Sequence, residues 1–294
     1  MASEELEMIN ELLRAQDFAS LSLEEQRAAV EGGIGQVPTG TVIDPIDAGG
    51  VACEWIRTPD AGSATTIVSL RGGGYCLGSL HSNRWFSSLL SESVGGRVLN
   101  VGYPNAPEHR FPAALDSVLA AYRWLVADTD PATIAIVGNS AGGGLTLATL
   151  LALRDAGDPL PACAVAISPW TDLTNSGDSI QTNAATEVML DAGGIDETAT
   201  LYADAEQLRE PYVSPLWGDL SGLPPILLHA SSSELLLDDS TRFAERAATH
   251  GADVTLEVTD GVPHVWHTFG GFLPEADEAM ARLGSWVSAR LADR

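Results

Sequence analysis

The apolar residues of this chain change their spacing along its length, so that short apolar runs alternate with longer amphipathic ones. The short runs are typical of buried strands and lie at residues 66–70, 97–102, 133–137, 162–167, 225–230 and 254–258. The longer runs carry apolar residues at helical spacing and lie at residues 113–126, 143–154, 238–250 and 275–291. This alternation predicts an α/β fold with a mostly parallel central sheet and helices on both faces.

The first part of the chain precedes this alternation. Residues 4–30 have apolar positions at helical spacing, and Ser22 and Glu25 fit a capping box, which predicts two short amphipathic helices. Residues 41–58 predict a two-stranded hairpin. Because the two helices come before the first strand, we expect them to pack on the outside of the sheet.

The alternation also stops between residues 168 and 223. Two short helices are predicted there, at 184–190 and 198–206. An insertion at this level of such a sheet lies over the carboxyl ends of the strands, where ligands bind. The expected units are a helical cap from residues 1–40 and 173–212 and a core from residues 41–172 and 213–294.

The composition fits one large α/β domain, because 45% of the 294 residues are hydrophobic. The chain has 15 basic residues, all of them arginine, against 40 acidic residues, and its formal net charge is −25. Such a chain is a poor partner for nucleic acid or for an anionic membrane surface. Three scattered cysteines without metal-ligand spacing, and the lack of a signal-peptide or membrane-spanning pattern, predict a reduced, cytoplasmic protein.

Residues 138–142, Gly-Asn-Ser-Ala-Gly, are the strongest indication of a catalytic site, because they place a serine between a predicted strand and a predicted helix. A serine lifted off the end of a sheet needs a sharp turn, and the residues two before and two after it then come too close for side chains. Gly138 and Gly142 meet this demand, so Ser140 is the candidate nucleophile. The turn also aims the amide of Ala141 at the oxygen of a carbonyl that Ser140 attacks.

A serine nucleophile needs a general base, and the chain offers six histidines. His229 lies within a predicted strand and His250 at a helix end, which favours structural roles. His264 and His267 follow the last predicted strand, and the loops after parallel strands gather along one edge of a sheet. We expect His264 to be the base because it is nearer to the turn, and His267 to be a packed loop histidine.

A buried acid must orient that histidine and stabilise its cation. Glu234 lies on the loop after the strand at 225–230 and is the expected acid. Asp238 and Asp260 are the alternatives, although Asp238 also fits the N-terminus of the following helix.

Serine, acid and histidine follow one another in the order of an α/β-hydrolase. Residues 71–75, Arg-Gly-Gly-Gly-Tyr, resemble the HGGG oxyanion loop of the bacterial hormone-sensitive-lipase-like (family IV) esterases, and residues 138–142 resemble their GDSAG elbow. Further segments similar to this family are residues 103–114, 168–174 and 211–216. The resemblance covers most of the chain from about residue 41 onward and implies the α/β-hydrolase fold with a cap.

The resemblance also implies the roles of individual residues. Ser140 corresponds to the family's nucleophile, Glu234 to its acid and His264 to its base. The family's oxyanion donors correspond to the amides of Gly73, Gly74 and Ala141. Family members cleave esters of short and medium acyl chains without a cofactor.

Three positions depart from the family pattern: Arg71 replaces its histidine, Glu234 its aspartate and Asn139 the second residue of its elbow. Arg71 matters most, because a longer cationic side chain beneath the oxyanion loop is a candidate for repositioning that loop. One lost oxyanion donor costs about a hundredfold in turnover.

We therefore expect a serine carboxylesterase with a Ser-His-Glu triad and a small-molecule ester substrate. The alternatives are a lactone or amide hydrolase on the same triad, and a hydrolase-like binding protein without turnover. Candidates for lining the substrate pocket are Tyr75, Met8, Val188 and Met189. The strand at 254–258 is a plausible sheet edge, and the pairing of two such edges predicts a homodimer.

Overall fold

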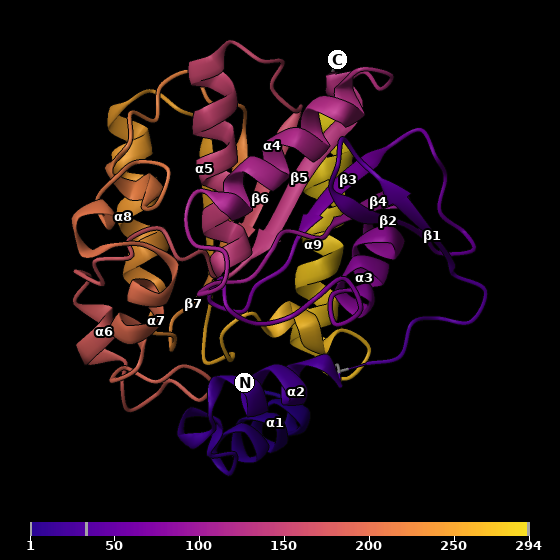
Figure 1. The fold of residues 1–294 in the computed structure, drawn as a ribbon. Coiled ribbons are helices and arrows are strands. Elements are labelled where there is room, and N and C mark those ends of the chain that lie inside the picture. Colours follow the sequence, from indigo (N-terminus) through magenta and orange to yellow (C-terminus); the bar gives the residue numbers. More distant parts are fainter. Residues whose placement is uncertain (1, 33–34, 293–294) are drawn as a thin grey trace.

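A single sheet forms the centre of the computed structural model, which describes residues 2–32 and 35–292 (Figure 1). Within these residues the sheet has eight strands in the order β1-β2-β4-β3-β5-β6-β7-β8. The strands are β1 Val42–Asp47, β2 Ala52–Arg57, β3 Thr66–Leu70, β4 Arg97–Val101, β5 Ile134–Asn139, β6 Cys163–Ile167, β7 Ile226–Ser231 and β8 Val254–Thr259. The β1–β2 and β2–β4 pairs are antiparallel, and the other pairs are parallel. The predicted hairpin and the predicted parallel sheet are both confirmed.

Burial along the strands follows their place in the sheet. Every residue of β3, β5, β6 and β7 is buried, as expected for parallel strands covered on both faces. Strand β8 is only half-buried, and it ends the sheet next to β7. The predicted sheet edge at 254–258 is therefore confirmed.

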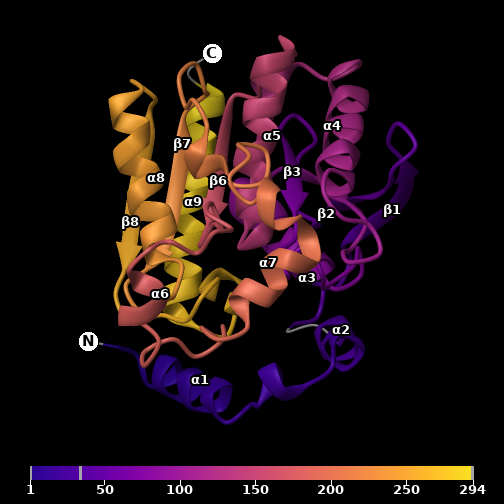
Figure 2. The same cartoon turned by 60° about the vertical axis from the view of Figure 1, so that its left-hand side comes forward.

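Helices cover both faces of the sheet (Figures 1 and 2). One face carries α3 Arg84–Val94 and α9 Pro274–Ala292, and the other carries α4 Ala113–Val126, α5 Ala141–Ala156 and α8 Leu237–Thr249. Successive residues of a strand point to opposite faces of the sheet. In β3, Ile67 packs against the cluster that includes α3 and α9, and Val68 packs against the cluster that includes α4, α5 and α8.

The sequence pattern does not predict helix α3. Its buried positions include Ser87, Ser88 and Ser91 among the apolar residues, which hides the helical period. The Ser88 hydroxyl donates to the carbonyl of Arg84, and the Ser91 hydroxyl donates to the carbonyl of Gly96. Satisfied hydroxyls let these serines sit in the core where the pattern would call for apolar residues.

The remaining helices gather at one end of the molecule (Figures 1 and 2). They are α1 Glu4–Arg14, α2 Leu23–Glu31, α6 Ser179–Thr182 and α7 Ile195–Tyr202. Short 3₁₀ segments are Phe18–Ser20, Pro131–Thr133, Ala205–Gln207, Pro215–Trp217 and Trp266–Phe269. The two predicted N-terminal helices and the capping box of Ser22 and Glu25 are confirmed.

The helix predicted at 184–190 is wrong, because this stretch forms turns and bends. The cause is Glu187, whose Oε1 accepts the amides of Val188 (2.8 Å), Met189 (2.8 Å) and Leu190 (3.2 Å). A side chain that takes the amides of its own successors competes with the helical hydrogen-bond pattern.

The division into a cap (1–40 and 173–212) and a core (41–172 and 213–294) stays a prediction. Residues 1, 33–34 and 293–294 of these segments lie outside the described residues. No helix in the described part of the chain combines the length and the apolar character needed to cross a membrane.

Candidate active site

Ser140 lies at the sharp turn between β5 and α5. Its φ is 54°, and its amide donates to the carbonyl of Ile167 at 2.8 Å, in the neighbouring strand. A Cβ on Gly142 would lie 2.2 Å from the carbonyl oxygen of Leu70, and one on Gly138 would lie 2.1 Å from that of Gly142. The close approach predicted for the two glycines is confirmed, and it holds the Ser140 hydroxyl at the end of the sheet.

The side chains of Ser140, His264 and Glu234 form one hydrogen-bonded line. The Ser140 Oγ lies 2.9 Å from Nε2 of His264, and Nδ1 of His264 lies 2.5 Å from Oε2 of Glu234. His264 is 3% exposed and Glu234 is 1% exposed. A hydroxyl, an imidazole and a buried carboxylate in this order can move a proton off the hydroxyl.

The last residue of β7 fixes the carboxylate of Glu234. The amide of Ser231 donates to Oε1 of Glu234 at 2.8 Å, which leaves Oε2 for His264. The two alternative acids have other partners. Asp238 accepts the amide of Ser179 at the start of α8, and Asp260 accepts the hydroxyl of Ser232 on the surface.

The loop that carries His264 is held from two sides. Val265 has a φ of 50°, and its amide donates to the hydroxyl of Ser168 at 3.2 Å. The side-chain amide of Asn10, on α1, donates to the carbonyl of Gly261 at 3.3 Å. The sequence indicates a family resemblance around Ser168 but no role for this residue, because its partner Val265 is 97 residues away along the chain.

A buried carboxylate anchors the segment that follows Ser168. The amides of Thr171 and Asp172 donate to Oδ2 of Asp239 at 2.6 and 2.8 Å. Burial raises the pKa of Asp239 to about 8. Asp239 lies in the first turn of α8, and nothing in the local sequence indicates this contact with residues 67 and 68 positions away.

His267 lies three residues after His264 and is fully buried. Its Nε2 lies 2.7 Å from Nδ1 of His229, the histidine inside strand β7. Burial lowers the pKa of His229 to about 3 and that of His267 well below its usual value. His267 is therefore packed in its loop, as predicted, and both imidazoles are neutral at pH 7.

The loop predicted to hold the oxyanion, residues 71–75, follows β3 and lies against Ser140. A Cβ on Gly72 would lie 3.2 Å from the Cβ of Ser140. Gly73 has a φ of 103°, and its carbonyl accepts the amides of Cys76 and Leu77, which closes a tight turn. In the described part of the chain, the amides of Gly73, Gly74 and Ala141 donate to no protein acceptor, so they are available to a ligand oxygen.

Arg71 is built into the base of this loop. Its Nη2 donates to the carbonyl of Tyr103 at 2.9 Å and to Oδ1 of Asn105, and its Nε donates to the carbonyl of Leu77 at 3.3 Å. The guanidinium also stacks 3.6 Å above the Tyr103 ring. Burial lowers the pKa of Arg71, which is 4% exposed. Arg71 thus joins the beginning of its loop to Leu77 further along the same loop, and it joins the loop to residues 103 and 105 after β4.

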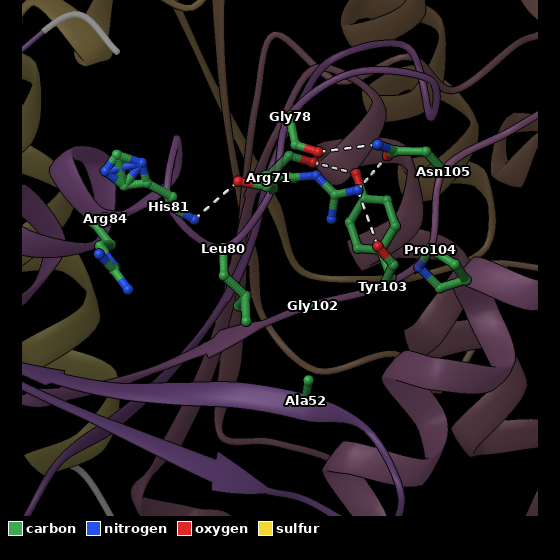
Figure 3. A pocket seen from close by; sticks show the side chains of 11 residues that line it. Ala52, Arg71, Gly78, Leu80, His81, Arg84, Gly102, Tyr103, Pro104 and Asn105 are labelled. Atoms are coloured by element: carbon green, nitrogen blue, oxygen red, sulfur yellow. Dashed lines mark hydrogen bonds between the residues drawn. The ribbon is translucent and has the colours of Figure 1, made fainter. Parts of the chain in front are cut away.

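A cavity of about 450 Å³ opens beside Arg71 (Figure 3). Its lining includes Leu80, His81, Arg84 and Tyr103 and does not include Ser140. Figure 3 shows the hydrogen bonds that join Arg71 to Tyr103 and Asn105 along one side of the cavity. The cavity thus lies on the Arg71 side of the oxyanion loop.

The four predicted lining residues lie in different surroundings. Tyr75 is 2% exposed and stacks on Tyr202 of α7 with ring centroids 3.7 Å apart, so its ring joins the oxyanion loop to that helix. Met8 of α1 is 56% exposed, and Val188 and Met189 are half-buried beside Glu187. Contact of these side chains with a substrate stays a prediction.

Known proteins resemble this chain over nearly its whole length. The profile of the α/β-hydrolase fold family matches residues 67–268. An acetyl-hydrolase of Streptomyces hygroscopicus is 40% identical over 98% of this chain and 97% of its own length. An ethyl acetate hydrolase of Pseudomonas putida is 35% identical over 76% of this chain and 72% of its own length. The crystal structure of an esterase from the bacterial hormone-sensitive lipase family has a TM-score of 0.94 at 38% identity, over 99% of both chains.

Proposed function

This chain belongs to the α/β-hydrolase fold family, among the bacterial hormone-sensitive lipase family esterases, and from this premise we propose how it acts. It is a carboxylic ester hydrolase, and we infer that it cleaves short- to medium-chain esters through Ser140, His264 and Glu234. The observation that carries this proposal is the continuous hydrogen-bonded line from the Ser140 hydroxyl to the buried Glu234 carboxylate.

The first half of the reaction forms an acyl-enzyme. His264 Nε2 takes the proton of the Ser140 hydroxyl while Oγ bonds to the ester carbonyl carbon. The carbonyl oxygen becomes an oxyanion that accepts the amides of Gly73, Gly74 and Ala141. The bond to the alkoxy oxygen then breaks, and His264 returns the proton to the departing alcohol.

The second half uses water in place of the serine. His264 takes a proton from water while the hydroxide adds to the acyl carbon. The bond between that carbon and Ser140 Oγ then breaks, the carboxylic acid leaves, and His264 returns the proton to Oγ. The Glu234 carboxylate, 2.5 Å from His264 Nδ1, stabilises the imidazolium in both halves. Its 1% exposure strengthens this ion pair, because water does not screen it.

The names of two relatives support a preference for short acyl chains. The relatives from Streptomyces hygroscopicus and Pseudomonas putida are named acetyl-hydrolase and ethyl acetate hydrolase. Helix α1 packs on the loop of His264 through Leu6 and Val262, which supports a place for the N-terminal helices in a cap over the site. We propose that residues 1–40 and 173–212 form this cap, with Met8, Val188 and Met189 on its inner side.

Two further proposals concern the state of the protein. Half-buried β8 ends the sheet, and Val258 is 47% exposed, which supports a homodimer formed by pairing of two β8 edges. Light scattering that detects only monomer would remove this proposal. The buried thiols of Cys53 and Cys76, which form no disulfide, support a cytoplasmic location.

Hydrolysis of p-nitrophenyl esters, from acetate to long acyl chains, tests the proposed function. We expect turnover that peaks at short chains in the parent and disappears in Ser140→Ala. A lactone or anilide that is cleaved faster than every open-chain ester would point to a different acyl substrate. Ligand binding without any turnover would instead indicate a binding protein.

A further inference from the structure

The segment between α6 and α7 is tied to the loop that carries Glu234. Its polar side chains bond to four consecutive residues of that loop, 232–235. The side-chain amide of Asn183 donates to the carbonyls of Ser232 (3.0 Å) and Glu234 (2.9 Å). The hydroxyl of Thr186 donates to the carbonyl of Ser233 at 3.0 Å.

Glu187 completes this attachment. Its Oε2 accepts the amide of Leu235, the residue after Glu234, at 3.0 Å. Its Oε1 accepts the amides of Val188, Met189 and Leu190 in its own segment. The Glu187 carboxylate therefore binds backbone amides of its own segment and of the loop that carries Glu234 (the acid loop, residues 232–235) at the same time.

These contacts divide the positioning of Glu234 between two sources. Its side chain is set by the amide of Ser231 and by His264. Its main chain is set from the insertion, because Asn183 binds its carbonyl and Glu187 binds the next amide. A displacement of Glu187 would thus change the distance between Oε2 of Glu234 and Nδ1 of His264, which is 2.5 Å.

We propose that Glu187 is a positioning residue, which places Glu234 on His264 and couples this placement to the backbone of Val188 and Met189. The proposal rests on the proposed function, since it assumes that Glu234 orients the base. It also has a direct consequence for substrate choice. A substrate that displaces Val188 or Met189 would also displace the Glu187 carboxylate, which binds the amide of Leu235 in the loop of Glu234.

Glu187→Gln tests the proposal with little change in shape. A glutamine oxygen can accept the amides on one side only, and its NH₂ group faces backbone N–H groups on the other. We expect kcat to fall between about tenfold and a hundredfold, because small misplacements of a catalytic group have effects of this size. KM should change far less than kcat.

Asp191→Asn is the matched control. Asp191 lies four residues further along, carries the same charge and accepts the amide of Gly193 at 3.1 Å within the insertion. The substitution removes one negative charge from the same segment without touching the acid loop. Its kcat should equal that of the parent.

A double-mutant cycle separates positioning from a merely structural role. With Glu234→Gln already present, adding Glu187→Gln should lower kcat by less than about twofold, because the group it positions is gone. An additive loss, or an unchanged kcat in Glu187→Gln alone, would overturn the proposal. If Glu187→Gln fails to fold, Asn183→Leu, which removes the bond to the Glu234 carbonyl, must show the same non-additivity. If the parent itself cleaves no ester, the proposed function fails first, so the two failures are distinguishable.

Discussion

His229 and His267 form a buried imidazole pair, with Nδ1 of His229 2.7 Å from Nε2 of His267. One ring donates and the other accepts, so this hydrogen bond forms with both imidazoles neutral. The outer side of His229 faces Glu257, whose carboxylate is 3.4 Å from Nε2, and Arg282 bonds to that same carboxylate. Both imidazoles are buried, and His267 belongs to the same loop as His264, so the pair is a neutral part of the core next to that loop.

This pair predicts a loss of stability in mild acid. Burial, and then the charge of Arg282, lowers the pKa of His229 to about 3, and burial lowers that of His267 well below its usual value, whereas unfolded histidines titrate at pH ~6.5. Above that pH neither state binds a proton, so the pair contributes no pH dependence. Below it only the unfolded chain gains protons, and the free energy of unfolding falls by about 1.4 kcal/mol per pH unit for each histidine.

Denaturant unfolding of His229→Gln and of the parent, from pH 7 to pH 4.5, checks this prediction. The pH slope of the variant should be smaller than that of the parent by about 1 kcal/mol per pH unit. His109→Gln, at an exposed loop position, is the control and should keep the parent slope. Equal slopes for all three proteins would show that His229 is not kept neutral by the fold.

Arg71 supports the oxyanion loop in this chain, although the family usually has a histidine there. A histidine in Arg71→His is too short to bond to Asn105 and to the carbonyl of Leu77. The oxyanion loop then loses this support, so we expect turnover to fall about tenfold or more. Steady-state kinetics on p-nitrophenyl acetate gives the answer, with Arg57→Met at an exposed strand position as the control. Faster turnover in Arg71→His would mean that the arginine distorts the loop.

Arg27 anchors α2 to the core. Its guanidinium donates to the carbonyls of Cys76 (2.9 Å) and Ala106 (2.8 Å) and pairs with both oxygens of Glu108. Arg27→Gln should loosen α2 and raise KM about threefold with kcat nearly unchanged, because a partly exposed ion pair contributes up to about 1 kcal/mol. Faster proteolytic cleavage within α2 should accompany this change. Arg14→Gln, at an exposed position of α1, is the matched control, and an equal effect of both substitutions would contradict the assigned role.

The sequence predicts the sheet and most helices closely, because their apolar period is unbroken. The strand at 66–70 and the helix at 113–126 have the same bounds as β3 and α4. The failures occur where polar side chains bond to the local backbone. Buried serines hide α3, and the Glu187 carboxylate turns a helical sequence at 184–190 into bends.

The candidate site divides in the same way. Turn chemistry and strand order lead to Ser140, His264 and Glu234, with Asp238 and Asp260 left as alternatives for the acid. The side chains of Ser140, His264 and Glu234 are hydrogen-bonded in line in the structure. The tasks of Arg71 and Glu187 depend on partners 34 and 48 residues away along the chain. No local pattern reports such contacts, so these residues could be placed only once the fold was known.

The most direct test of the central claim is the mass of the enzyme during turnover of p-nitrophenyl acetate. We expect a burst of one p-nitrophenol per chain and an added acetyl group on the peptide that contains Ser140, because the acyl-enzyme forms on that hydroxyl. Ser140→Ala should give neither the burst nor the added mass, and His264→Asn should form the acetyl-enzyme far more slowly. An acetyl group on any other residue, or full turnover by Ser140→Ala, would contradict this account.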